Sequence, residues 1–558
     1  MPKSHNYDAI VVGSGITGGW AAKELTERGL RTLVLERGRK LDHVKDYPTT
    51  AQPPWESPTR FQVSPAVAKD DPVQSGVYCF NEATRHFWVK DTEHPYSTPE
   101  GRGFHWIRGY HVGGKSLMWG RQCSRWADLD FEANARDGHG TDWPIRYADL
   151  APWYDYVERF VGVSGRKEGL PQLPDGIFQP PMDMNCVEAE VKARIEKQWP
   201  ERRMTIGRVA NLTRPINGRS ACQYRNLCYR GCPFGAYFSS QSGTLPAAAA
   251  TGNLTLRPDS VVTHVLYDQS TNRSTGVRAL DTETGDYREY TARVVFLCAG
   301  ALNSTWILLH SGLANSSGVL GCYLTDQHYR IGARGRVEGF DDKYYFGGRP
   351  TGIIIPRFRN LDAAGQRPDY LRGFNYQGWA NRAGWTRGLN NDNYGADFKD
   401  DLFRPGPWTM TLLAFGETLP RRHNHVRLNP DLLDVHGLPT LHIDGRFSDN
   451  EDRMRIDMKN AAAEMLEAAG LKEVETYEQP ESYVMGDAIH EMGTARMGTD
   501  PRTSVLNRWN QTHDIPNLFV TDGACMASAS CKNPSVTYMA LTARAVDRAA
   551  RLLSQGEL

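Results

Sequence analysis

The sequence predicts an α/β protein with two folding units, one built on a parallel sheet and one on an antiparallel sheet. Three observations support this prediction. Residues 7–36 have the pattern of strand, glycine-rich turn, helix and strand. Residues 327–480 alternate short strand-like runs with turns rich in Gly, Asp and Asn. The chain has 558 residues, more than a single hydrophobic core normally organises.

The composition is that of a globular protein and excludes two classes of partner. Hydrophobic residues make up 40% of the chain and charged residues 23%, and the formal net charge is zero. A neutral chain has no bulk attraction to nucleic acid or to an anionic membrane surface. No apolar run approaches the ~18 residues of a membrane span, so no direct membrane span is expected.

The N-terminal segment carries a dinucleotide-binding fingerprint. The apolar run 7–12 ends in the sequence G-S-G-I-T-G, and a helix and a second strand follow before Glu36. Gly13, Gly15 and Gly18 allow the backbone to approach a pyrophosphate at the helix N-terminus. Glu36 is spaced to accept a ribose hydroxyl and argues against a 2′-phosphate. The segment therefore predicts a Rossmann-type βαβ unit.

The remaining elements follow from hydrophobic periodicity and from turn residues. In the first unit we expect helices over 20–28, 147–161 and 186–199, and strands over 254–258, 260–267, 275–280, 288–291 and 293–297. In the second unit we expect strands over 352–357, 409–415 and 425–428, closed by a helix over 449–469.

Three of the ten cysteines stand close together, and the others are scattered without regular spacing. Cys222, Cys228 and Cys232 form the pattern C-x5-C-x3-C, followed by Pro233. This distribution is not a disulfide framework, which a chain of this length does not need. The spacing indicates instead a site that uses three thiols.

Two further segments fit the binding of a nucleotide. Gly113, Gly114 and Ser116 lie in a second glycine-rich loop, which could equally be a simple tight turn. Asp522 follows a short apolar strand near the C-terminus. Its carboxylate could hold the ribityl or phosphate part of a flavin dinucleotide, or it could be an ordinary residue of a strand-to-turn junction.

Two polar residues near the C-terminus are candidates for proton chemistry. His490 lies in a loop with Gly and Thr positions, and imidazole is the side chain best suited to take a hydroxyl proton near neutral pH. A structural histidine is the alternative. Thr494 excludes the zinc motif H-E-x-x-H, because a second histidine would be needed there. Asn533 is expected to cap a helix in which Pro534 takes the first position.

Taken together, these motifs resemble the glucose–methanol–choline (GMC) flavoprotein oxidoreductases, whose fold is like that of p-hydroxybenzoate hydroxylase. The resemblance implies a Rossmann-type FAD-binding domain over 1–326, with the cysteine segment at 221–240. It implies an α+β substrate-binding domain on an antiparallel sheet over 327–480, and a return to the FAD-binding domain over 481–558. No histidine is placed for covalent attachment, so FAD is expected to be bound non-covalently.

The resemblance also assigns roles to individual residues. A histidine in the position of His490 removes the hydroxyl proton of the substrate, and Asn533 hydrogen-bonds the same oxygen. Hydride then passes to the flavin. The strand around Val262 is expected to offer its backbone to the adenine. The sequence departs from the family pattern at Trp119, where many members have an asparagine.

The cysteine segment is similar to that of bacterial members that carry a 3Fe–4S cluster, among them catalytic subunits of glucose, fructose and glucoside-3 dehydrogenases. Three thiolates at Cys222, Cys228 and Cys232 suit a three-iron core. A structural zinc would require a fourth ligand, which the segment lacks, and a site without metal is the other alternative. A cluster would pass electrons singly to a protein, here expected to be a c-type cytochrome.

The resemblance bears on location as well. The few residues before the first strand leave no room for a leader, which alone predicts a cytoplasmic protein. Related catalytic subunits, however, are exported with a small subunit that carries the signal. The expectation is therefore the bacterial periplasm, with a small signal-bearing subunit as partner.

The cysteine segment is most similar to the glucoside 3-dehydrogenase branch. This similarity implies oxidation of a secondary hydroxyl of a sugar, at C3 of a glucoside, to a ketone. The alternatives within the class are glucose C1, fructose C5 and gluconate C2. A hydroxynitrile-lyase-like member without redox turnover, or an electron-transfer module that is no enzyme, would belong to other classes.

Overall fold

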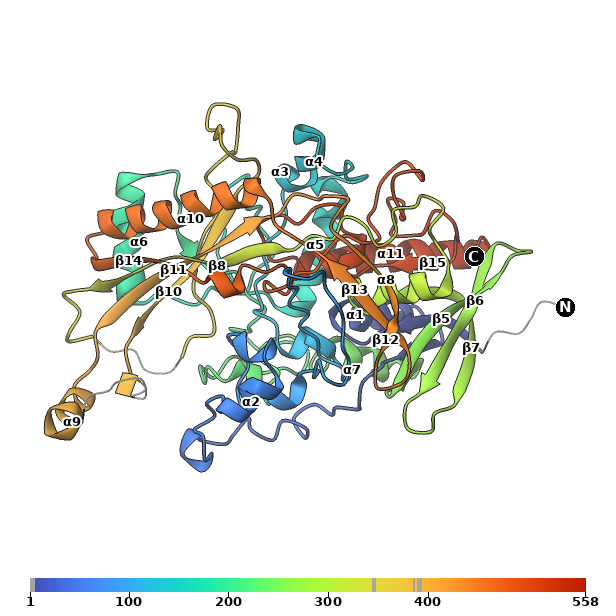
Figure 1. The fold of residues 1–558 in the computed structure, drawn as a ribbon, viewed down its shortest axis with the longest axis horizontal. Helices are drawn as coiled ribbons and strands as arrows, with labels where there is room; N and C mark the ends of the chain where they lie inside the picture. Colours follow the sequence, from blue (N-terminus) through green and yellow to red (C-terminus); the bar gives the residue numbers. More distant parts are fainter. Residues whose placement is uncertain (1–5, 344–347, 385–386, 389–393) are drawn as a thin grey trace.

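Two β-sheets stand at opposite ends of the molecule (Figure 1). The computed structural model describes residues 6–343, 348–384, 387–388 and 394–558. Residues 1–5, on which the expectation about a leader depends, lie outside this range. The C-terminus lies at the end of the molecule that holds the first sheet.

The first sheet is seven-stranded, with the order β4-β2-β1-β7-β6-β5, and β15 pairs with β7. Strands β4, β2, β1, β7 and β15 are parallel, whereas β5, β6 and β7 form an antiparallel meander. The bounds are β1 Tyr7–Val12, β2 Thr32–Leu35, β4 Leu254–Arg257, β5 Ser260–Asp268, β6 Arg273–Asp281, β7 Tyr287–Leu297 and β15 Leu518–Val520.

Strand β7 joins the two parts of this sheet. The prediction of separate strands over 288–291 and 293–297 was wrong, because the 11 residues of β7 form one strand. Its first part pairs with β6 as far as Thr291, and its second part pairs with β1 from Ala292 onward. The pairing partner changes from β6 to β1 at this point while the strand continues. A sequence pattern does not distinguish such a change of partner from a turn between two strands.

Helices cover the first sheet and hold its glycine-rich turn. Helix α1 (Ile16–Glu27) begins directly after Gly15, four residues before the expected start, so its N-terminus lies at the turn. It packs against α7 and α11. The further helices of this unit are α5 Tyr147–Val161, α7 Thr244–Ala250, α8 Ala301–Ser311 and α11 Ser535–Gln555, and the shorter α2 Pro65–Asp70, α3 Asp128–Phe131 and α4 Ala133–Asp137.

The second sheet is six-stranded, with the order β14-β8-β11-β10-β9-β3, and its pairings are antiparallel. Helices α10 (Asp449–Ala468) and α6 (Cys186–Gln198) lie over one of its faces (Figure 1). The strand bounds are β3 Thr205–Ile206, β8 Gln327–Val337, β9 Ile353–Ile355, β10 Phe374–Arg382, β11 Trp408–Glu417 and β14 Lys472–Glu478, and α9 spans Gly395–Phe403.

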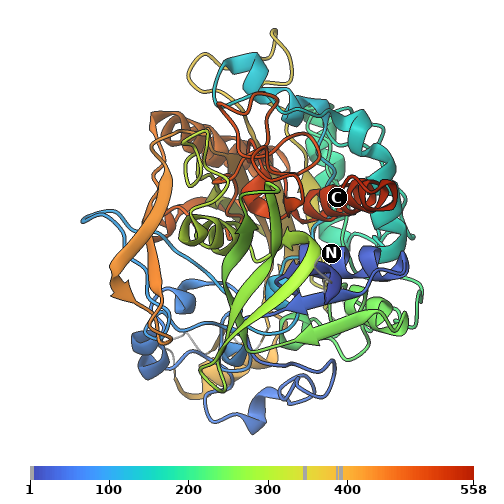
Figure 2. The same cartoon turned by 90° about the vertical axis from the view of Figure 1, so that its right-hand side faces the viewer.

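The two structural units do not follow the expected boundaries along the chain. Helix α6 and strand β3 precede residue 327, yet they pack with the second sheet. A hairpin of β12 (His425–Leu433) and β13 (Pro439–Asp444) lies within 327–480 but packs against α8 of the first unit. The view along the long axis shows this hairpin beside the first sheet (Figure 2). In the described part of the chain, no helix has the length and apolarity required to cross a bilayer.

Candidate active site

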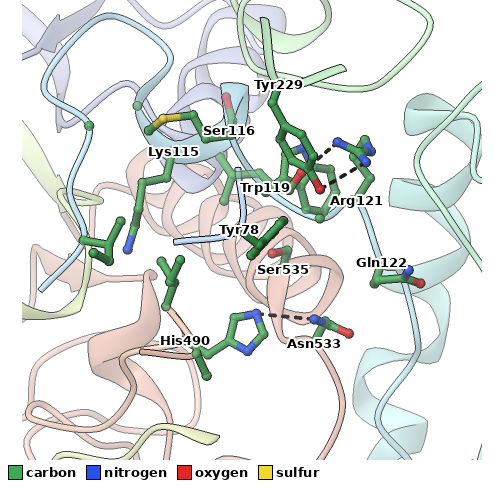
Figure 3. A pocket seen from close by; sticks show the side chains of 18 of the residues that line it. Tyr78, Lys115, Ser116, Trp119, Arg121, Gln122, Tyr229, His490, Asn533 and Ser535 are labelled. Atoms are coloured by element: carbon green, nitrogen blue, oxygen red, sulfur yellow. Dashed lines mark hydrogen bonds between the residues drawn. The ribbon is translucent and has the colours of Figure 1, made fainter. Parts of the chain in front are cut away.

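A cavity of about 1500 Å³ runs between the two sheets. One end is lined by the glycine-rich turn after β1 and by residues of β5. The other end is lined by side chains of β8, β10 and β11. His490 and Asn533 lie in its wall (Figure 3). A dinucleotide and a small substrate could therefore meet in one continuous space.

The glycines of the fingerprint are required by close backbone contacts. Gly13 has φ +94°, and a Cβ there would lie 2.5 Å from the carbonyl oxygen of Cys298. A Cβ at Gly18 would lie 1.9 Å from the carbonyl oxygen of Gly13. At Gly15, by contrast, a Cβ would meet no atom within 4 Å, and this residue lines the cavity. The turn thus leaves space where a pyrophosphate would approach the N-terminus of α1.

Glu36 connects the two glycine-rich loops. Its Oε2 accepts hydrogen bonds from the backbone N–H and the hydroxyl of Ser14, at 3.0 and 2.6 Å, and its Oε1 accepts from the N–H of Gly38. The Ser14 hydroxyl in turn accepts from the N–H of Gly113 at 2.9 Å. The Ser116 hydroxyl donates to the carbonyl of Gly113. Burial raises the pKa of Glu36, and its hydrogen-bond donors oppose this shift.

The remaining predicted cofactor residues also line the cavity. Gly114 continues the second glycine-rich loop there, and Val262 lies in β5 beside a register shift in its pairing with β6. The carboxylate of Asp522 accepts backbone hydrogen bonds from Gly300 and Ala524, each at 3.0 Å. Burial raises the pKa of Asp522 to about 6. The structure therefore brings the predicted cofactor residues of four distant segments to one cavity.

These residues fit a flavin dinucleotide. Beyond the open space at Gly15, several buried polar atoms of residues in the cavity wall have no hydrogen-bond partner among the described residues. Among them are the Tyr538 hydroxyl and Oε1 of Glu491, both close to the histidine loop in sequence or contact. Unpartnered buried polar atoms are costly, so their presence indicates a polar ligand. FAD would supply both a pyrophosphate and a polar ring edge.

Gln327 fixes the tautomer of His490. Its amide nitrogen donates to the carbonyls of Ser530 and Lys532, each at 2.9 Å, so its oxygen must face the imidazole. That oxygen lies 3.0 Å from Nδ1 of His490. Because an amide oxygen only accepts, Nδ1 carries the proton. Nε2 then bears the lone pair of the ring, as a general base requires.

Asn533 faces His490 and does not cap a helix. Its expected role as N-cap was wrong, since α11 begins at Ser535 with Pro534 in the cap position and no side-chain cap. The oxygen of Asn533 accepts from the amide of Gln377 at 2.8 Å, which turns its nitrogen toward Nε2 of His490 at 3.4 Å. The Asn533 amide thus donates to the Nε2 lone pair, which places a donor and an acceptor at one point of the cavity wall (Figure 3).

His490 is neutral over the whole physiological range. Burial, together with the nearby charge of Lys115, lowers its pKa to about 3. Lys115 is itself paired with Glu491 at 2.9 Å. A neutral imidazole with a protonated Nδ1 can accept a hydroxyl proton at Nε2 without first losing one of its own.

Asp326 holds the backbone of the histidine loop. The carboxylate of Asp326 accepts the backbone N–H groups of His490 and Gly486, at 3.1 and 2.8 Å. Burial and the charge of Glu491 raise the pKa of Asp326 to about 7. Ile489 has φ +63°, a conformation that a β-branched residue rarely adopts. The loop before His490 is therefore strained and held in place by specific contacts.

The cysteine segment reaches the wall of the cavity. Cys222, Cys228 and Cys232 are all half-buried and form no disulfide, and the neighbouring Tyr224 and Tyr229 line the cavity. Burial raises the pKa of the Cys222 thiol, and the nearby Cys228 and Cys232 raise it further. The three thiols thus share one region. In the part of the chain that the structure describes, no group of three ligating side chains has metal-site geometry.

Trp119, where the sequence departs from the family pattern, also lies in the cavity wall. Its indole N–H donates to the carbonyl of Phe238 at 2.8 Å. Three positioning residues escaped the sequence analysis: Asp326, Gln327 and Gln377. No local pattern marks them, because each acts on a residue more than 150 positions away.

Comparison with known proteins defines the family. Two models of the GMC oxidoreductase family match the chain, one over residues 7–329 and one over residues 420–542. The chain belongs to the GMC oxidoreductase family, whose members bind FAD and oxidise CH–OH groups. The predicted fold, an α/β FAD-binding domain with an antiparallel substrate domain, is confirmed.

Individual relatives match almost the full length of the chain. It is 28% identical to a 2-methyl-1,2-propanediol dehydrogenase of Mycolicibacterium austroafricanum, over 98% of this chain and 96% of that protein. It is 26% identical to a fructose dehydrogenase large subunit of Gluconobacter japonicus, over 98% of both chains. Among solved structures, a pyridoxine 4-oxidase from Mesorbium loti superposes with a TM-score of 0.60 at 18% identity, covering 97% of this chain and 99% of that one.

Proposed function

We propose that this protein is an FAD-dependent dehydrogenase that oxidises a secondary hydroxyl of a sugar or polyol, at C3 of a glucoside, to a ketone. The observation that carries the proposal is the pair His490 and Asn533, held by Gln327 and Gln377 at one point of the cavity wall. Relatives named for a diol and for fructose support the substrate class.

The chemistry assigned to these residues follows from their orientation. Nε2 of His490 accepts the proton of the substrate hydroxyl, and Nδ2 of Asn533 donates to the same oxygen. Both groups favour the alkoxide character that develops as the carbinol C–H bond breaks. FAD, when bound, supplies the acceptor of the hydride. We assign its binding to Gly13, Gly15, Gly18, Glu36, Gly113, Gly114, Ser116, Val262 and Asp522.

The far wall of the cavity suits a polyhydroxylated ligand. Strand β10 contributes Gln377, Trp379 and Asn381 to the cavity, and Tyr477 of β14 lies there too. Trp379 is 38% exposed. Aromatic faces pack on the apolar face of a sugar ring, while amides bind its hydroxyls. Glucose C1, fructose C5 and gluconate C2 remain alternatives within this class.

The route of the electrons forms a second part of the proposal. We assign a 3Fe–4S cluster to Cys222, Cys228 and Cys232, since three half-buried thiols in one loop are the donor set that a three-iron core needs. The cluster would pass electrons one at a time to a protein, a c-type cytochrome. A small signal-bearing subunit and a periplasmic location complete this proposal, with a cytoplasmic location as the alternative.

Anaerobic mixing with a panel of glucosides and polyols tests the reaction. Bleaching of the flavin absorbance by a glucoside, with a 3-keto product identified by NMR, is the expected result. A carbonyl at C1, C2 or C5 would reassign the oxidised carbon. A flavin that stays oxidised while substrate is consumed would identify the lyase alternative, and a flavin that reacts with no member of the panel would favour the electron-transfer module.

The substitution Cys228→Ser tests the electron route. Bleaching of the flavin by substrate should remain within a factor of about two, because the thiol lies outside the proton chemistry. Transfer to a c-type cytochrome should fall by at least about tenfold, as expected when a ligand of the relay is lost. The buried Cys123→Ser is the matched control. Equal loss of both activities in the Cys228 variant would assign the segment a structural role.

A further inference from the structure

A buried ion pair adjoins the loop that carries Asn533. The ammonium of Lys532 contacts the carboxylate of Asp130, and the two side chains are only 4% and 1% exposed. Lys532 directly precedes Asn533, whereas Asp130 lies in α3, 402 positions before Lys532. Neither Asp130 nor Lys532 is among the residues that line the cavity. The ion pair can therefore affect a substrate only through other residues.

Asp130 holds one side of the loop 530–533. Its Oδ1 accepts a hydrogen bond from the hydroxyl of Ser530 at 2.7 Å. Its Oδ2 accepts from the ammonium of Lys532, and from the backbone N–H of Ala127 at 2.7 Å. The Ser530 hydroxyl in turn accepts from the backbone N–H of Lys532 at 3.2 Å. Ser530 has φ +53°, a left-handed conformation that such contacts must stabilise.

The second sheet holds the other side of the loop. Gln327 of β8 donates its amide to two carbonyls, those of Ser530 and Lys532, each at 2.9 Å. The carbonyl between them, that of Cys531, accepts from the amide of Asn375 in β10 at 2.6 Å. Three successive carbonyls thus bind side chains of the antiparallel sheet. The loop is fixed between this sheet and α3.

The ion pair matters more for direction than for stability. A buried pair adds little to the free energy of unfolding on average, because the desolvation of both charges offsets their attraction. The direction of the loop, however, affects two side chains. Asn533 follows Lys532 in the chain, and Gln327, oriented by the loop carbonyls, holds Nδ1 of His490. A displaced loop would turn the Asn533 amide and release the Gln327 amide at the same time.

We propose that Asp130 and Lys532 are positioning residues, whose ion pair fixes the orientation of Asn533 and, through Gln327, that of His490. This inference rests on the proposed function, because it requires that His490 takes the hydroxyl proton of the substrate. The proton acceptor and the amide donor must converge on one oxygen. A loss of their orientation therefore lowers the rate of the chemical step without weakening substrate binding.

The experiment removes both charges together in the FAD-loaded protein, because a single substitution would leave one charge buried and unpaired. With Asp130→Asn and Lys532→Met combined, the limiting rate of flavin bleaching should fall at least about tenfold. The substrate concentration at half-saturation should change by less than about twofold. The matched control combines Arg125→Met and Glu158→Gln, a buried pair whose hydrogen-bond partners lie outside the loop, and should retain the wild-type rate.

A second comparison tests whether the ion pair acts through Gln327 and Asn533. The two charge-removing substitutions are introduced into protein that already carries Gln327→Met and Asn533→Ala. Because both orientations are lost in this background, removal of the ion pair should lower the remaining rate by less than about twofold. A further loss of about tenfold would overturn the inference, since the effects would then be independent. An unchanged limiting rate in the variant that lacks only the ion pair would also overturn it.

If the variant without the ion pair fails to fold, Ser530→Ala decides the inference. It removes only the hydroxyl between the loop and Asp130, and should lower the limiting rate by about threefold at unchanged half-saturation. An unchanged rate would overturn the inference. Normal bleaching in His490→Ala would refute the proposed proton chemistry and this inference with it. A wild-type flavin bleached by another alcohol but by no sugar or polyol would refute only the proposed substrate class, and the rates are then compared with that alcohol.

Discussion

The wall that carries His490 and the wall that carries Arg121 face each other across the cavity (Figure 3), but they hold their polar groups in different ways. On the first wall, Gln327, His490, Asn533 and Gln377 form a chain of neutral groups, each oriented by the next. On the second wall, a permanent cation lies among tyrosine rings with no carboxylate among the described residues.

The difference bears on the proposed function, which assigns the proton chemistry to the first wall alone. A proton moves over a short distance and needs a donor and an acceptor whose directions are fixed, which a neutral amide chain provides. The Arg121 guanidinium stays protonated in proteins and cannot accept a proton, so the second wall takes no part in this step. The following predictions, in order of decreasing effect, test whether the two walls are separable in this way.

The largest effect is expected from His490→Ala. Loss of the general base should lower the rate of flavin bleaching by substrate at least about 100-fold, with FAD content unchanged. Stopped-flow absorbance measures the rate. His513→Ala is the matched control, because His513 lies in the same C-terminal segment but outside the cavity wall. A near-normal rate in the His490 variant would remove this residue from the mechanism.

A smaller effect is expected from Gln377→Leu. Without this donor the amide of Asn533 is free to turn, so the rate of flavin bleaching should fall by about tenfold as orientation is lost. The substitution Gln479→Leu removes another amide of the cavity wall that does not contact Asn533, and should have little effect. Equal effects of the two substitutions would show that the amides act only through substrate binding.

The smallest effect, and the most specific, is expected from Gln327→Glu. The wild-type pKa of about 3 leaves His490 unprotonated, so the bleaching rate should show no acidic limb between about pH 5 and 8 from this residue. A carboxylate beside Nδ1 favours the imidazolium and raises that pKa. Since only the neutral ring is a base, the variant should lose activity as pH falls, by about threefold at pH 5.

The control for this pH profile is the variant Gln327→Met, which removes the hydrogen bond without adding charge. It should lower the rate at all pH values and introduce no acidic limb. An acidic limb near pH 6.5 in the wild-type protein would contradict the buried, neutral state assigned to His490.

The sequence predicted those site residues whose roles depend on local chain geometry. The turn at Gly13, Gly15 and Gly18 and the carboxylate of Glu36 are specified by spacing within one βαβ unit, and the structure places them in one site. His490 and Asn533 could be selected because a family resemblance marked their loops. Their meeting in the cavity wall could not be derived from spacing, since 43 positions separate them.

The residues that sequence reasoning missed act across the two units. Gln377 belongs to β10 of the second sheet, and Gln327 begins β8, yet both orient side chains of the C-terminal segment. Arg121 differs from the other cations of the cavity wall because no carboxylate pairs with it among the described residues, and the lack of a distant counter-charge has no sequence pattern. Asn533 was assigned to a helix cap because its local sequence favours one, but tertiary contacts direct the side chain elsewhere.

The hydrogen bond from Gln377 to Asn533 makes the orientation of the Asn533 amide depend on the relative position of the two units. The donor Gln377 belongs to the antiparallel unit, and the acceptor Asn533 belongs to the C-terminal segment of the first unit. A small shift of one unit relative to the other would therefore misalign the Asn533 amide before it disturbed the hydrophobic core of either unit. Turnover should consequently report inter-unit docking more sensitively than melting temperature does. Substitutions at the contact between the two units should therefore abolish activity while the protein remains folded.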